Sequence, residues 1–79
     1  MNHQNVYVIR DRGGNYISPR HTKRGWFFVT YTGDATGFTF YSNIETAQGE
    51  VNILNNLGND FYLDLVDFKS IPKGRRINL

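Results

Sequence analysis

The 79-residue chain contains no cysteine, and histidine occurs only twice. No disulfide can therefore stabilise the fold, and a structural zinc site, which normally takes four Cys or His ligands, is not expected. The longest uninterrupted apolar run is Trp26-Phe27-Phe28-Val29, far short of the roughly 20 residues that a membrane-spanning helix needs. We therefore expect stability to come from packing or self-association, with no metal, cofactor or membrane.

The beginning of the chain lacks one further signal. Residues 1–5 have neither the basic segment nor the apolar run of a secretory signal peptide, so we expect a cytoplasmic protein. A chain of this length has room for a single core, because a domain of this size buries only about 60% of its unfolded surface. We predict one domain over residues 1–79, with an ordered core over about 5–72 and a mobile basic tail over about 73–79.

Turn-forming residues near the start predict a first β-hairpin. Residues 6–10 are rich in β-forming side chains, and an extended pattern resumes at 16–18 after a glycine-containing turn. Pro19 is expected to end the second of these strands, because proline cannot donate to a sheet ladder. Residues 20–25 are then expected to form a polar, basic loop.

Three further segments have the composition of strands. Residues 26–32 and 38–41 are aromatic or β-branched and flank a glycine-containing turn, which predicts a second hairpin. Residues 61–66 alternate large apolar side chains with others and predict a last strand that pairs back into the sheet.

A helix is predicted between the last two of these strands. Ser42-Asn43-Ile44-Glu45 fits a capping box, in which the Ser and Glu side chains satisfy free backbone donors at a helix start. Apolar residues then recur at helical spacing, and Gly58 provides a stop. The predicted fold class is therefore α+β: an antiparallel sheet of four or five strands, in two hairpins plus a C-terminal strand, with one amphipathic helix on one face. The predicted core is Val6, Val8, Ile17, Trp26, Phe28, Phe38, Phe40, Ile44, Ala47, Val51, Leu54, Phe61, Leu63 and Leu65.

A set of local motifs carries a resemblance to known proteins. Residues 7–11 (YVIRD), residues 13–18 (GGNYIS) and residues 45–47 (ETA) occur in the same order as in small uncharacterised proteins of Gram-positive bacteria and their phages, which this chain resembles over roughly residues 6–57. The resemblance implies a phage or prophage accessory origin and carries over no catalytic residue.

Charge is sorted along the chain. Residues 1–30 sum to +4, residues 31–68 to −6 and residues 69–79 to +4, within a net charge of +2. Such sorting predicts a polarised field, in which a local patch binds an oppositely charged partner although the net charge is small.

Two surfaces are therefore candidates for binding. A basic surface, which would contact nucleic acid through the hairpin loops and the tail, comprises Arg10, Arg12, Arg20, Lys23, Arg24, Lys73, Arg75 and Arg76. An acidic and apolar surface, which would suit a protein partner or a homodimer, comprises Glu45, Glu50, Tyr62, Asp64, Val66, Asp67 and Phe68. The alternative for both sets is that they are ordinary solvated charges and core rings.

Catalytic and nucleotide-binding signatures are weak or absent. Ser18 and His21 lie three residues apart without a placed acid, and Gly13-Gly14 lacks the following Lys-Ser/Thr of a phosphate-binding loop. We therefore expect no enzymatic activity and no cofactor. The sequence favours a small non-enzymatic protein-binding module that acts on a host protein, and the alternative is a nucleic-acid-binding protein.

Overall fold

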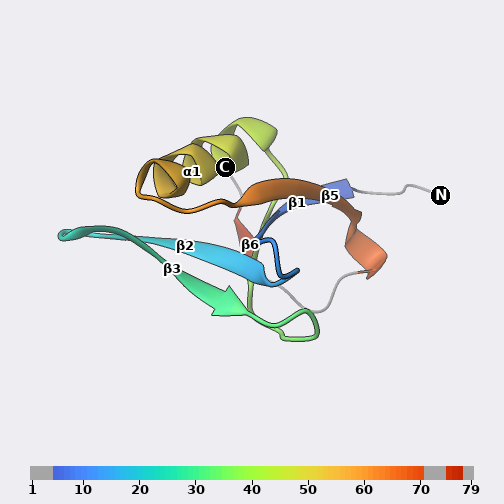
Figure 1. The fold of residues 1–79 in the computed structure, drawn as a ribbon. Helices are drawn as coiled ribbons and strands as arrows, with labels where there is room; N and C mark the ends of the chain where they lie inside the picture. The colour runs from blue at the N-terminus through green and yellow to red at the C-terminus, as the bar shows by residue number, and fades with distance from the viewer. Residues whose placement is uncertain (1–4, 71–74, 78–79) are drawn as a thin grey trace.

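The computed structural model describes residues 5–70 and 75–77, which form an α+β fold (Figure 1). Its elements are β1 (Asn5–Arg10), β2 (Tyr16–Thr22), β3 (Gly25–Tyr31), β4 (Thr39–Tyr41), α1 (Ile44–Asn56), β5 (Tyr62–Asp67), a 3-10 turn (Phe68–Ser70) and β6 (Arg75–Ile77). The predicted fold class is confirmed. In this part of the chain, no helix is long and apolar enough to cross a membrane.

Strand β1 is the centre of the sheet and pairs with three other strands. Along one edge it pairs antiparallel with β5, from Asn5↔Asp67 to Arg10↔Tyr62. Two strands share its other edge: β2 pairs at Ile9↔Ile17, and β4 pairs at Tyr7↔Tyr41. The sheet therefore divides beside β1, with β3 continuing from β2 and β6 lying parallel to β4.

The second hairpin differs from the prediction. Strand β3 pairs with β2, from Tyr16↔Tyr31 to Thr22↔Gly25, rather than with β4. Residues 20–25 are thus two strand ends and a tight turn instead of a loop, with Gly25 at a positive φ of 120° that favours glycine.

Pro19 does not end β2, because β2 no longer pairs with β1 at this position and no backbone N–H is needed there as a hydrogen-bond donor to β1. The register between β1 and β2 stops at Ile17, so the missing N–H of Pro19 removes no hydrogen bond to β1. Three residues of the predicted tail, Arg75–Ile77, form β6, and residues 71–74 and 78–79 lie outside the described residues.

Helix α1 begins at a different cap from the one predicted. The side-chain oxygen of Asn43 accepts hydrogen bonds from the backbone N–H groups of Glu45 (2.8 Å) and Thr46 (3.3 Å), whereas Ser42 is exposed. Asparagine caps a helix about as well as serine, so the helix starts one residue later. The predicted stop is confirmed, since Gly58 has a φ of 103° directly after the last turn.

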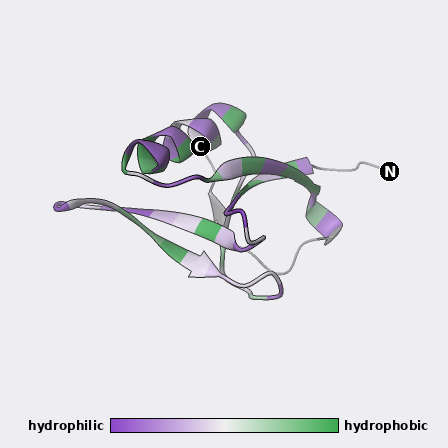
Figure 2. Ribbon diagram, in the orientation of Figure 1, coloured by the Kyte–Doolittle hydropathy of each residue, from purple (hydrophilic) through white to green (hydrophobic). Residues whose placement is uncertain are grey.

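Apolar side chains form two clusters, and the alternation of Val6 and Val8 with Ile9 along β1 places them on opposite sides of the sheet. Figure 2 shows apolar residues along α1, β3 and β5. The helix-side core consists of Ile9, Ile17, Tyr41, Ala47, Val51, Leu54 and Phe61, with Tyr7, Trp26, Phe28 and Leu63 packed against it. The opposite core consists of Val6, Val8, Tyr16, Phe38 and Phe40, with Tyr31 and Val66 packed against it. Strand β1 is therefore buried on both faces, which explains why Ile9 belongs to the core although alternation with Val6 and Val8 left it out.

Two predicted core residues are exposed. Ile44 is 51% exposed and Leu65 is 53% exposed. Ile44 is the first residue of α1, at the start of the stripe that faces the sheet. The helix-side core contains Phe61, which directly precedes β5, and Leu63 of β5 packs against it, but this core does not extend to Leu65.

Candidate functional site

The turn between β1 and β2 is organised by Asp11. Its carboxylate accepts hydrogen bonds from the backbone N–H of Gly13 (2.9 Å), the backbone N–H of Asn15 (3.0 Å) and the side-chain amide of Asn15 (3.0 Å). These donors, the Asn15 side chain first, lower the pKa of Asp11 because they stabilise its charged form. Asp11 therefore has a structural part in closing the turn.

Arg10 of the predicted basic surface is held in a stack and an ion pair. Its guanidinium lies 4.7 Å from the centre of the Tyr16 ring, and that ring stacks in turn on Phe38 at 4.0 Å. Its Nη1 donates to a carboxylate oxygen of Asp64 at 3.1 Å, and both side chains are partly buried. The charge of Arg10 is thus directed to the protein's own β5.

Arg12 is paired in the same way at the surface. Its Nε and Nη2 donate to the two carboxylate oxygens of Asp60, at 3.1 and 3.2 Å, and its guanidinium lies 4.9 Å from the centre of the Tyr62 ring. The hydrogen bond from Arg12 lowers the pKa of the Asp60 carboxyl. The pair adds little stability, because both side chains are largely exposed.

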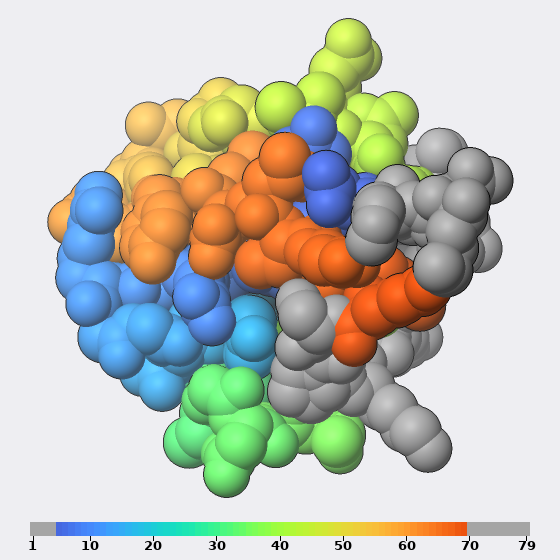
Figure 3. Space-filling view, turned by 90° about the vertical axis from the view of Figure 1, so that its right-hand side faces the viewer, coloured from blue at the N-terminus to red at the C-terminus, as the bar shows by residue number. Residues whose placement is uncertain are grey.

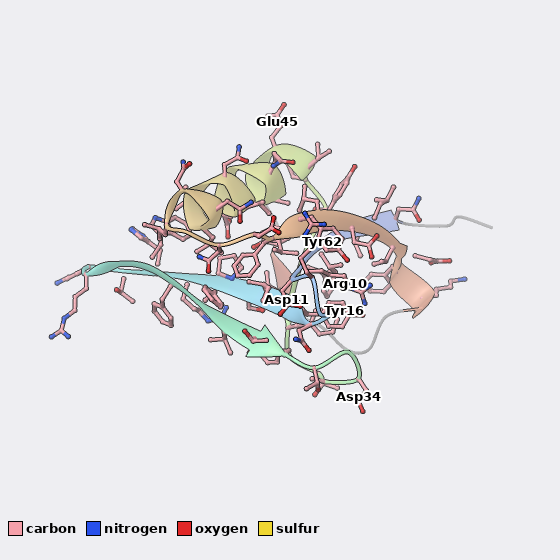
Figure 4. All side chains as sticks on the ribbon, in the orientation of Figure 1. Arg10, Asp11, Tyr16, Asp34, Glu45 and Tyr62 are labelled. Carbon is pink, nitrogen blue, oxygen red and sulfur yellow. The ribbon has the colours of Figure 1, made fainter. Side chains whose placement is uncertain are left out.

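The two predicted surfaces therefore meet at the β1–β2 turn (Figure 4). Arg10 and Arg12 come from the basic set, and Asp64 and Tyr62 from the acidic set. This part of the molecule has little charge left over for a partner.

The rest of the acidic and apolar set is dispersed over several elements. Glu45 is exposed in the first turn of α1, and Glu50 accepts a hydrogen bond from the Tyr41 hydroxyl at 2.8 Å.

Val66 packs on the opposite core, and Asp67 accepts from the backbone N–H of Lys69 at 3.0 Å. The ring of Phe68 packs edge-on against Phe40 at 5.5 Å. Figure 3 shows β5 and the 3-10 turn crossing one face of the molecule.

Three cations of the predicted basic surface, Arg20, Lys23 and Arg24, lie on the β2–β3 arm, which we define as residues 16–31. The arm has three basic side chains and no Asp or Glu. Lys23 and Arg24 are exposed at its turn, while Arg20 donates to the Pro19 carbonyl oxygen (3.1 Å) and to the Tyr31 hydroxyl (3.4 Å). Lys73 lies outside the described residues, and Arg75 and Arg76 are on β6.

The arm projects beyond the end of α1 (Figure 1), and its inner face anchors it to the body. Phe28 packs edge-on against Phe61, with ring centres 4.8 Å apart, and Trp26 packs on the helix-side core. At the tip, the Thr22 hydroxyl donates to the Gly25 carbonyl oxygen at 3.1 Å and accepts from the Arg24 N–H at 3.2 Å. The contacts of Trp26 and Phe28 therefore hold the arm against the body, and the hydrogen bonds of Thr22 fix the conformation of its turn.

The outer face of the arm combines charge with exposed aromatic surface. Phe27 lies opposite Arg20 across the hairpin and is 48% exposed. On the other face, the His21 and Trp26 rings lie 4.7 Å apart. Sequence reasoning did not select Phe27, because Trp26 and Phe28 flank it with equal bulk and alternation alone does not say which face is buried.

No group of three or more His, Cys, Asp or Glu side chains in residues 5–70 and 75–77 is arranged to hold a metal ion. Comparison of the chain with protein-family models, with curated proteins and with solved structures finds no match. The resemblance to small Gram-positive and phage proteins therefore stays a prediction.

Proposed function

We propose that the chain is a non-enzymatic protein-binding module and that the β2–β3 arm is its binding surface. The observation that carries the proposal is the arm's composition: cations at Lys23 and Arg24 and exposed apolar area at Phe27, with no carboxylate in between. Protein interfaces are enriched in aromatic and Arg side chains. Charge complementarity indicates an acidic partner.

The resemblance of residues 6–57 to small phage proteins adds the origin to the proposal. We propose a phage- or prophage-encoded accessory protein whose partner is a host protein in the cytoplasm. Two structural observations make the arm a better surface for this role than the predicted acidic set. Asp64 is engaged by Arg10, and Val66 packs on the opposite core.

Nucleic-acid binding is the second candidate, and the tip of the arm favours it. The tilted His21 and Trp26 rings flank Lys23 and Arg24 in the sequence, and aromatic rings beside cations are a common surface for single-stranded nucleic acid. Against it, two arginines of the predicted basic surface already pair with carboxylates. Fewer free cations mean fewer phosphates neutralised and weaker binding.

The test compares two matched double variants with the wild-type protein. The arm variant, Arg24→Ala with Phe27→Thr, removes one exposed cation and one exposed apolar side chain from the arm. The control variant, Arg12→Ala with Leu57→Thr, removes the same kinds of side chain elsewhere; Leu57 is 62% exposed. Each immobilised protein is incubated with a Gram-positive cell lysate, and retained proteins are quantified by mass spectrometry.

We expect one or a few acidic proteins to be retained by the wild type and the control variant and lost with the arm variant. Equal retention by both variants would contradict the proposal. In parallel, fluorescence anisotropy of labelled DNA and RNA is measured at low and physiological salt. Salt-sensitive binding that only the arm variant loses would establish the second candidate instead.

A further inference from the structure

We propose that the outer edge of β3 binds an extended acidic segment of the partner as an added, hydrogen-bonded β-strand. This inference rests on the proposed function and names the partner's chemistry and its mode of binding. It follows from the position of β3 in the sheet, from the charges around it, and from the rigidity of the arm.

Strand β3 stands at one end of the sheet. Among the described residues it pairs only with β2, along all seven residues from Gly25 to Tyr31. Backbone groups in an antiparallel pair point alternately toward and away from the partner strand, so β3 presents a row of N–H and C=O groups on its far side. It contains no proline to interrupt that row. Such an edge accepts an extended polypeptide by strand addition.

The charges of the arm indicate which kind of strand would be added to it. Lys23 and Arg24 form no ion pair within the described chain, and Arg20 donates only to uncharged oxygens. With three cations and no carboxylate on each arm, two copies of this chain would repel one another if paired edge to edge. An added strand with Asp or Glu would instead be attracted.

The side chains of β3 support the same geometry. Phe27 is 48% exposed and would pack against the side chain placed beside it on an added strand. Phe28 is fixed by its contact with Phe61 on the other face, so the edge is held in place before the partner arrives. Preorganisation of this kind lowers the entropic cost of binding.

The other unpaired edge supplies an internal comparison. Strand β5 also pairs only with β1 among the described residues, but its sequence includes Asp64 and Asp67 and no cation. Because β5 has no cation and its Asp64 is already paired with Arg10, an acidic segment gains no charge attraction at β5 and should bind to β3 instead.

The experiment uses the full chain and defined probes. A fluorescein-labelled ten-residue peptide that alternates glutamate with valine or threonine is titrated by fluorescence anisotropy. One control peptide has lysine in place of glutamate. A second keeps every side chain but is N-methylated at alternate residues, which removes the N–H groups along one edge without touching the protein. An oligothymidylate of equal charge serves as a nucleic-acid probe.

We expect the glutamate peptide to bind with salt-sensitive affinity, and the N-methylated peptide to bind about tenfold more weakly for the loss of a few backbone hydrogen bonds. The lysine peptide should not bind. Amide NMR shifts should change along residues 25–31 and not along β5. The arm variant should bind weakly and the Arg12→Ala, Leu57→Thr control normally.

Contrary outcomes separate the two proposals. Strand addition would be overturned if the N-methylated peptide bound as tightly as the unmethylated glutamate peptide, or if the changes in amide NMR shifts were centred on β5. The proposed function would stand in that case if the arm variant still loses its protein partner from lysate. Tighter binding of the oligothymidylate than of the glutamate peptide would overturn both proposals in favour of nucleic acid.

Discussion

The hydrogen bond between Ser18 and β4 closes the place where the sheet divides. Strand β2 leaves β1 after Ile17, and β4 takes its place along the same edge of β1. At this junction the buried hydroxyl oxygen of Ser18 accepts a hydrogen bond from the backbone N–H of Thr39 at 2.8 Å. Ser18 is 0% exposed and Thr39 is 3% exposed, so water has no access to replace either partner.

The substitution Ser18→Ala should be costly for so small a change in volume. It leaves the Thr39 N–H buried without its acceptor, and such a group costs about 1–3 kcal/mol. Small domains are stable by only about 5–15 kcal/mol, so a substantial part of the free energy of unfolding is lost. The midpoint of thermal unfolding should fall by about 4–8 °C for each kcal/mol.

Urea unfolding followed by Trp26 fluorescence measures this loss, with Thr30→Ala on the exposed part of β3 as the control. Hydrogen exchange of the Thr39 amide reports the same bond directly and should accelerate in Ser18→Ala. A loss of less than about 0.5 kcal/mol, equal to that of an ordinary surface substitution, together with an unchanged Thr39 exchange rate, would refute the reasoning.

Three further predictions follow from the corrected elements. Asn43→Ala should lower the free energy of unfolding by about 0.5–2 kcal/mol through loss of the helix cap, and Ser42→Ala should change it little. Chemical denaturation of the two variants measures the difference, and a larger loss in Ser42→Ala would mean that Ser42 caps the helix. Phe61→Ala should cost about 3–5 kcal/mol because its ring is buried, whereas Leu65→Ala should cost much less, and equal losses would contradict the assigned faces. Burial, and then the hydrogen bond to Glu50, raise the pKa of Tyr41 well above its ordinary 10.0. The protonated phenol therefore stabilises the folded state below pH 10.0, and this stabilisation is lost as the pH rises toward the pKa of Tyr41 in the folded state. Absorbance at about 295 nm, which reports tyrosine ionisation, should show one tyrosine ionising only when the protein unfolds.

Elements with local signals were predictable from the sequence. The first hairpin depends on a turn a few residues long, and the helix depends on apolar spacing and on Gly58. The cap was misplaced by one residue because Ser42 and Asn43 are both good caps. Neighbouring residues in the sequence do not decide between them.

Pairings between distant elements were not predictable in the same way. Pro19 was expected to end β2. A strand tolerates a proline where no neighbouring strand needs its N–H, and for Pro19 this depends on where β1 stops pairing with β2, which the residues next to Pro19 in the sequence do not reveal. Likewise, Arg10 and Asp64 are 54 residues apart in the chain, and their types suggested two opposite surfaces. Only the pairing of β1 with β5 shows that these charges largely satisfy each other, which leaves the β2–β3 arm as the candidate site.

The central position of β1 has a kinetic consequence. Its longest pairing is with β5, which is formed by residues near the other end of the described chain, so the sheet cannot be completed until that distant segment arrives. Folds dominated by such non-local pairings fold in about milliseconds to seconds, more slowly than helical domains. Until then β1, with Val6, Val8 and Ile9 on its two faces, is an uncovered apolar strand that is prone to pair with other chains. The slow step in folding should therefore also be the step most sensitive to protein concentration.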